Sequence, residues 1–87
     1  MSTVKRIETA KGKVIYVIFS TTVNGKIEYG IQVTSKIFES TEIASVSRIT
    51  SDLEFAEKLL ALLADNLVLP STLSEVVEDY VAAAFTV

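Results

Sequence analysis

The sequence contains no cysteine and no histidine, and each absence removes a class of chemistry. Without cysteine the chain has no disulfide framework, no thiolate metal site and no cysteine nucleophile. Without histidine it lacks the usual general base, the commonest metal ligand and every Ser-His pair. The adjacent residues Ser35 and Lys36 make a poor catalytic dyad, because neighbouring strand residues point to opposite faces. We therefore expect a protein that is not an enzyme and binds no cofactor.

Glycines and long apolar runs are also scarce. The three scattered glycines, Gly12, Gly25 and Gly30, form neither a P-loop nor a dinucleotide-binding fingerprint. The most apolar stretch is interrupted by charged residues before it reaches the length of a membrane span, and residues 1–13 lack the apolar region of a signal peptide. We expect a cytoplasmic protein with no membrane association.

Charge is unevenly divided along the chain, whose 87 residues fit a single domain, 1–87. The strand-rich part, 1–50, carries seven basic and four acidic side chains, a net charge of +3. The helical part, 51–87, carries one basic and seven acidic side chains, a net charge of −6. Such polarity either steers partners of opposite charge or means only that the two parts attract each other or face solvent, and the latter is favoured.

Nucleic-acid binding would need the basic side chains to gather at one end of the sheet. The residues concerned are Lys5, Arg6, Lys11, Lys13, Lys26 and Lys36. The overall charge of −3 opposes a broad phosphate-binding surface, so no nucleic-acid partner is predicted.

A hairpin dominates the first half. Residues 13–22 are dense in β-branched and aromatic side chains, Asn24-Gly25 is a strong two-residue turn signal, and 26–34 return as the partner strand. A weaker strand, 4–9, precedes the hairpin through a tight turn at residues 10–13. With Asn24 and Gly25 as the loop, the register predicts a core face made by Val14, Tyr16, Ile18, Ile27, Tyr29, Ile31 and Val33.

The opposite face of this hairpin carries an apolar stripe of Ile15, Val17 and Phe19. Phe19 falls opposite Gly30, where a ring can cover the bare glycine backbone. If the first strand pairs with the hairpin, Val4, Arg6 and Glu8 flank the stripe on its other side.

The pattern is less regular from Ser35 to Thr50. Ile37 and Phe38 extend the hairpin strand, residues 39–42 form a turn, and 43–50 form a further strand. Its apolar residues, Ile43, Val46 and Ile49, break strict alternation, which a β-bulge would reconcile.

The second half predicts two helices. Residues 51–69 form a strongly apolar helix that starts with a capping box of Ser51 and Glu54. Its apolar arc is wide enough to need two neighbours. Pro70 ends it, and 71–85 form a second, outer helix. We therefore predict an α+β fold, an antiparallel three- or four-stranded meander followed by a two-helix hairpin packed on one face.

Acidic residues offer the remaining route to metal chemistry. Glu75 with Glu78 or Asp79 lies on one helix face at spacings where carboxylates hold Mg²⁺ or Ca²⁺. One helix supplies too few ligands, so solvated carboxylates are favoured and no metal site is predicted. A carboxylate-based, metal-dependent hydrolase using Glu75 and Asp79 is the most distant hypothesis.

Three stretches between residues 13 and 81 carry a family resemblance. They are Tyr29-Gly30-Ile31 in a hairpin strand, Ile49 and Asp52 before an apolar helix, and the proline-led segment 70–80. In these the chain resembles a small uncharacterised family of bacterial domains of unknown function, mostly from Gram-positive anaerobes. Relatives in that family often place a histidine where this chain has Thr72. The resemblance implies hairpin-led strands followed by two helices, and no activity.

Hydrophobic residues make up 49% of this small chain, which predicts apolar surface left for a partner. Our leading hypothesis is a non-catalytic interaction module that self-associates, as a homodimer. The candidate interface residues are Ile15, Val17, Phe19, Phe55, Leu59 and Leu62. The alternative is a regulatory domain that binds another protein or a small apolar ligand, along an exposed strand edge or between helix and sheet.

Overall fold

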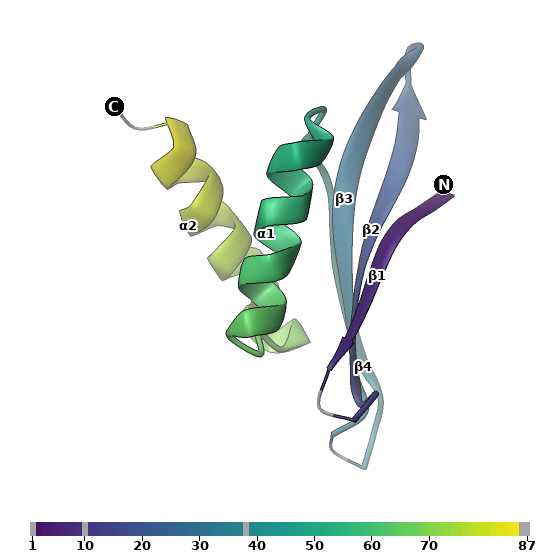
Figure 1. Ribbon diagram of the computed structural model, residues 1–87, viewed down its shortest axis with the longest axis vertical. Coiled ribbons are helices and arrows are strands. Elements are labelled where there is room, and N and C mark those ends of the chain that lie inside the picture. Colours follow the sequence, from purple (N-terminus) through teal and green to yellow (C-terminus); the bar gives the residue numbers. More distant parts are fainter. Residues whose placement is uncertain (1, 10, 38, 86–87) are drawn as a thin grey trace.

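A computed structural model describes residues 2–9, 11–37 and 39–85 of the chain. Four strands form one antiparallel sheet in sequential order: β1 (Ser2–Thr9), β2 (Val14–Val23), β3 (Lys26–Ser35) and β4 (Glu42–Thr50). They are followed by α1 (Leu53–Asp65), the short 3-10 helix η1 (Pro70–Thr72) and α2 (Leu73–Phe85). Both helices lie on one face of the sheet (Figure 1). The predicted α+β fold is confirmed, with four strands.

The β2–β3 hairpin has the register predicted from its turn. Asn24 and Gly25 both have positive φ, +50° and +78°, and the strands pair from Val23 opposite Lys26 onward. Five of the seven predicted core residues are fully buried: Val14, Tyr16, Ile18, Ile31 and Val33. Tyr29 is half-buried, whereas Ile27 is 53% exposed and was wrongly assigned to the core. It lies near the hairpin tip, which extends past α1 (Figure 1).

A bulge interrupts the pairing of β3 with β4, as predicted. Ile31 pairs with Val46 and Tyr29 with Thr50, and Arg48 inside the bulge has a φ of +56°. The extra residues turn both Val46 and Ile49 toward the core. Ile43 stays on the opposite face, opposite Thr34, and is 62% exposed.

The segment after β3 differs from its prediction. The strand ends at Ser35, and Ile37 is exposed beyond it. Phe38 lies outside the described residues.

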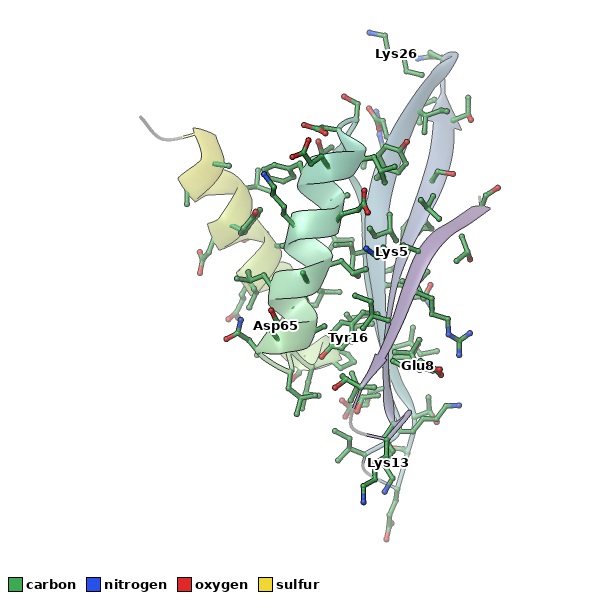
Figure 2. The ribbon with its side chains drawn as sticks, viewed as in Figure 1. Lys5, Glu8, Lys13, Tyr16, Lys26 and Asp65 are labelled. Atoms are coloured by element: carbon green, nitrogen blue, oxygen red, sulfur yellow. The ribbon has the colours of Figure 1, made fainter. Side chains whose placement is uncertain are left out.

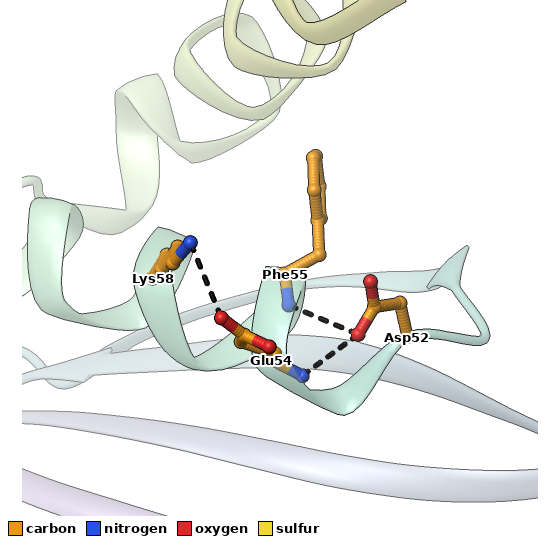
Figure 3. A network of polar contacts seen from close by, with 4 residues as sticks. All are labelled: Asp52, Glu54, Phe55 and Lys58. Atoms are coloured by element: carbon orange, nitrogen blue, oxygen red, sulfur yellow. Dashed lines mark hydrogen bonds and ion pairs between the residues drawn. The ribbon is translucent and has the colours of Figure 1, made fainter.

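Helix α1 begins at Leu53 and is capped by Asp52, not by Ser51 as predicted. The Asp52 carboxylate accepts hydrogen bonds from the backbone N–H groups of Glu54 (3.0 Å) and Phe55 (3.4 Å) (Figure 3). Glu54 pairs instead with Lys58, one turn later, at 3.3 Å. The predicted capping box is therefore wrong. The cap is one residue later, at Asp52, whose carboxylate accepts hydrogen bonds from both backbone amides itself.

The same helix ends four residues before its predicted end. Leu67 adopts a left-handed conformation, with a φ of +47°. Its N–H bonds the carbonyl of Ala64 (3.2 Å), and the N–H of Val68 bonds that of Leu63 (3.0 Å), which forms a Schellman motif. Pro70 does not end α1; it opens η1.

A buried hydrogen bond ties the helix connection to the middle of the sheet. The hydroxyl of Tyr16 donates to the carbonyl of Val68 at 2.9 Å, and Tyr16 lies between the sheet and the end of α1 (Figure 2). Burial raises the pKa of the Tyr16 phenol. Within the described residues, no helix combines the length and apolar character needed to cross a membrane.

Candidate functional site

The three interface candidates on α1 have different surroundings. Leu59 is completely buried against the sheet, so it belongs to the core and is removed from the candidate interface. Phe55 is half-buried and meets Tyr80 of α2 edge-on, with ring centroids 5.1 Å apart. Leu62 is 37% exposed. The sheet and α2 together use most of the apolar arc, and of these three residues only Leu62 keeps substantial exposure.

The stripe on the outer face of the sheet is only partly accessible. Ile15 and Val17 are half-buried, and Phe19 is only 6% exposed. The Phe19 ring lies against Gly30, where an added Cβ would come within 2.6 Å of Cζ. The predicted covering of the glycine by the ring is confirmed, and Phe19 has little surface left for a partner.

Strand β1 flanks this stripe largely as predicted. Arg6 lies opposite Val17 and Glu8 opposite Ile15, and the two charged groups pair at 2.9 Å. The prediction for Val4 was wrong, because a register shift between Thr3 and Lys5 places Thr3 opposite Phe19.

The charged side chains form neither the predicted cluster of basic residues nor, among the described residues, a group that could hold a metal ion. Lys13 and Lys26 lie at opposite ends of the sheet, so the six basic candidates do not gather at one end (Figure 2). Among the residues that the structure describes, no group of three or more histidine, cysteine, aspartate or glutamate residues is placed to hold a metal ion.

A concave feature of the described part of the chain lies between β4 and α2. Helix α2 contacts β4 and then leans away from the sheet toward its C-terminal end (Figure 1). A groove of about 350 Å³ opens between them. Its lining is mostly apolar and consists of Val46, Ser47, Arg48 and Ile49 from β4 with Val77, Glu78, Val81 and Ala82 from α2. Sequence reasoning named a site between helix and sheet but could not place it.

The groove adjoins a strand edge with outward-facing backbone groups. The hydrogen bond from the Lys36 N–H to the Lys13 carbonyl, 2.7 Å, shows that even-numbered residues of β3 bond to β2. The odd-numbered residues of β3 therefore bond to the even-numbered residues of β4. Ile43 and Ser45 direct their N–H and C=O groups outward, and no described strand lies beyond β4.

Two charged residues line the groove, and their situations differ. Arg48 donates from Nε to Glu28 on the sheet at 2.8 Å, so its charge is balanced. Within the described part of the chain, Glu78 has no hydrogen-bond or ion-pair partner. The groove is therefore an apolar surface with one unbalanced negative charge at its rim.

Comparison with known proteins gives a family and no activity. No curated protein and no solved structure matches the chain. The model of a family described as "Family of unknown function (DUF6514)" matches residues 1–83. That match covers every strand and most of α2, so the chain belongs to this family of unknown function, DUF6514.

Proposed function

We propose that the protein is a non-catalytic, cytoplasmic interaction module that takes up an extended segment of a partner polypeptide along β4. The added segment becomes a fifth strand of the sheet, and its helix-facing side chains enter the groove between β4 and α2. Addition of a strand to a free sheet edge is a common mode of peptide recognition, in which backbone hydrogen bonds give affinity and adjacent pockets give specificity.

One observation carries this proposal: the apolar groove and the outward backbone groups of Ile43 and Ser45 belong to the same strand. Neither feature alone indicates a binding mode. Side chains of an added strand alternate between the two faces of the sheet. A residue opposite Val46 would thus reach the groove while its neighbours bond to the outward groups of β4.

Selection from a random peptide library displayed on phage tests the proposal. We expect enrichment of peptides with apolar residues at alternate positions. Ser45→Pro removes an outward N–H, and a proline is tolerated where that N–H faces solvent. It should weaken binding of a selected peptide about tenfold, or about 1.4 kcal/mol.

The matched control is Arg6→Pro, which changes an outward-facing residue at the opposite edge of the sheet. It should leave the affinity unchanged. Failure to enrich any peptide, or equal loss in both variants, would contradict strand addition at β4.

Self-association is the second candidate, favoured by the outer face of the sheet. Ile15, Thr34 and Ile43 form a row across three strands, and no described element covers it. Sedimentation velocity over a wide concentration range tests it, and a monomer throughout would reject it. Val17→Lys and Leu62→Glu then separate an interface on the sheet from one on α1, without altering a fully buried residue.

A further inference from the structure

We infer that the segment bound along β4 is positively charged, with a lysine or arginine placed against Glu78. This inference rests on the proposed function, since it specifies the chemistry of the partner at the same groove. It depends on the position of one carboxylate and on the charges around it.

Geometry places the partner's helix-facing side chains beside α2. Before the bulge, Ala44 and Val46 of β4 face the helices, so a partner residue opposite Val46 would point toward the groove that Val46 lines together with Val77 and Val81. The next helix-facing side chain of the partner strand, two residues along, would also lie on the α2 side of the sheet, where the groove has its rim. Glu78 is the acidic residue of that rim.

The local charge balance selects a cation for this position. Arg48 is already paired with Glu28, whereas Glu78 has no ionic partner among the described residues. Glu75 precedes Glu78 by one helical turn on the same side, and both are exposed. No lysine or arginine occurs between residues 59 and 85. An incoming cation would meet attraction with no competing positive side chain on α2.

The same charges disfavour a second copy of the chain as the partner. Antiparallel pairing of two β4 strands places the helices of both copies on one side of the continuous sheet. The two α2 helices would then face each other across the symmetry axis with only acidic charged residues. Like charges facing each other across an interface weaken it, so a basic segment from a different protein is the better occupant.

The test measures charge in the selected peptides and at the rim. Peptides enriched on the wild-type protein should carry lysine or arginine at helix-facing positions. Glu78→Lys should weaken the best peptide about tenfold, because attraction becomes repulsion. Asp79→Lys makes the same charge change on the flank of α2 away from the groove, and should weaken it less than about twofold at physiological salt. Both positions are exposed, so folding is preserved.

Each outcome separates the inference from the proposed function. Peptides that need Ser45 but carry no basic residues, or that are insensitive to Glu78→Lys, would overturn the inference and leave strand addition in place. Equal losses in Glu78→Lys and Asp79→Lys would also overturn it, since a local contact would then be absent. A dimer abolished by Ser45→Pro would overturn it by assigning the edge to a second copy. No enriched peptide at all would overturn both.

Discussion

The two edges of the sheet, β1 and β4, differ in how they are protected from further strands. Strand β1 carries three charged residues within four positions, Lys5, Arg6 and Glu8. Its pairing with β2 also shifts register before Lys5. Lys5 also pairs with Glu57 of α1 at 3.3 Å, which links this edge to a helix. Charges and bulges of this kind are how natural sheets prevent edge-to-edge association.

Strand β4 lacks these devices along its regular part. Between Glu42 and the bulge at Arg48 it carries no charged residue, and Ile43 and Ser45 are exposed. Helix α2, which packs beside β4, leans away from the sheet toward its C-terminal end (Figure 1), whereas α1 is linked to β1 by the Lys5–Glu57 ion pair. Strand β1 thus has more of these protective features than the regular part of β4, so we expect binding by strand addition at β4 alone.

Among the variants considered, replacing Gly30 with alanine should cause the largest loss of stability, because it disturbs the pairing of β4 with β3. The new Cβ would lie 2.6 Å from the Val46 carbonyl oxygen and 2.6 Å from Cζ of Phe19. The ring can rotate aside, but the β4 backbone cannot without losing its pairing. We expect about 2–3 kcal/mol of destabilisation in urea unfolding. Adding Phe19→Leu to this variant should not restore its stability. A full recovery would show that the steric clash is with the Phe19 ring and not with the β4 backbone.

Removing the Tyr16 hydroxyl should lower the stability of the fold without changing the difference in peptide binding between the β1 and β4 edges. Tyr16→Phe leaves the buried carbonyl of Val68 without its donor, which costs about 1–3 kcal/mol of unfolding free energy. Affinity of a selected peptide should be unchanged once the variant is folded, since neither edge is altered. A loss below about 0.5 kcal/mol would mean that water replaces the hydroxyl.

The same variant carries a pH prediction. Burial raises the pKa of Tyr16 above its ordinary value of 10.0, so the unfolded chain loses the phenolic proton at a lower pH than the folded chain. The contribution of the neutral Tyr16 side chain to the free energy of unfolding is therefore fully present below about pH 10 and is lost as the pH rises above it. Unfolding measured in alkaline buffers should show this decline in the wild type and a shallower one in Tyr16→Phe. Identical slopes would contradict the assignment.

Leu67→Gly should stabilise the fold without affecting either edge. A left-handed conformation costs a non-glycine residue about 1–2 kcal/mol, and the greater freedom of glycine in the unfolded chain offsets part of the gain. We expect a net increase of about 0.5–1 kcal/mol in thermal unfolding. A decrease would show that the half-exposed leucine side chain contributes more by packing than its backbone strain removes.

Removing Arg6 and Glu8, two of the three charges of β1, should have the smallest effect on stability and gives the sharpest control on the comparison of the two edges. Arg6→Thr with Glu8→Thr deletes an exposed ion pair, which changes stability by less than about 1 kcal/mol. If the charges of Arg6 and Glu8 alone close this edge, the double variant gains a second peptide site, detected by titration stoichiometry. We expect at most weak binding, because the groove lined by β4 and α2 lies at the opposite edge of the sheet from β1. Equal affinity at both edges would contradict the role of the groove.

Local chemistry made much of the fold predictable. Asn24 and Gly25 determine the hairpin register, and the register in turn places Phe19 against Gly30. The spacing of Val46 and Ile49 predicted the bulge. These features depend on residues close in sequence or directly paired, which is why pattern and turn geometry suffice for them.

The errors and the site itself depend on tertiary packing. Periodicity showed that Leu59 and Leu62 share an apolar arc but not that the sheet would cover only Leu59. Asp52 is the cap in place of Ser51 because α1 begins only at Leu53, a boundary that the sequence pattern did not resolve. The groove arises from the tilt of α2, and its edge from the position of β4 at the end of the sheet. Neither is encoded in a local pattern, although the acidic run around Glu78 was visible.

Amide hydrogen exchange at individual residues, followed by NMR with and without a saturating selected peptide, tests the central claim most directly. In the free protein the amides of Ile43 and Ser45 should exchange rapidly, while those of Ala44 and Val46 are protected by pairing with β3. The peptide should slow exchange at Ile43 and Ser45 and leave Arg6 unchanged. Protection appearing at β1, or no change along β4 in the presence of a bound peptide, would contradict strand addition at this edge.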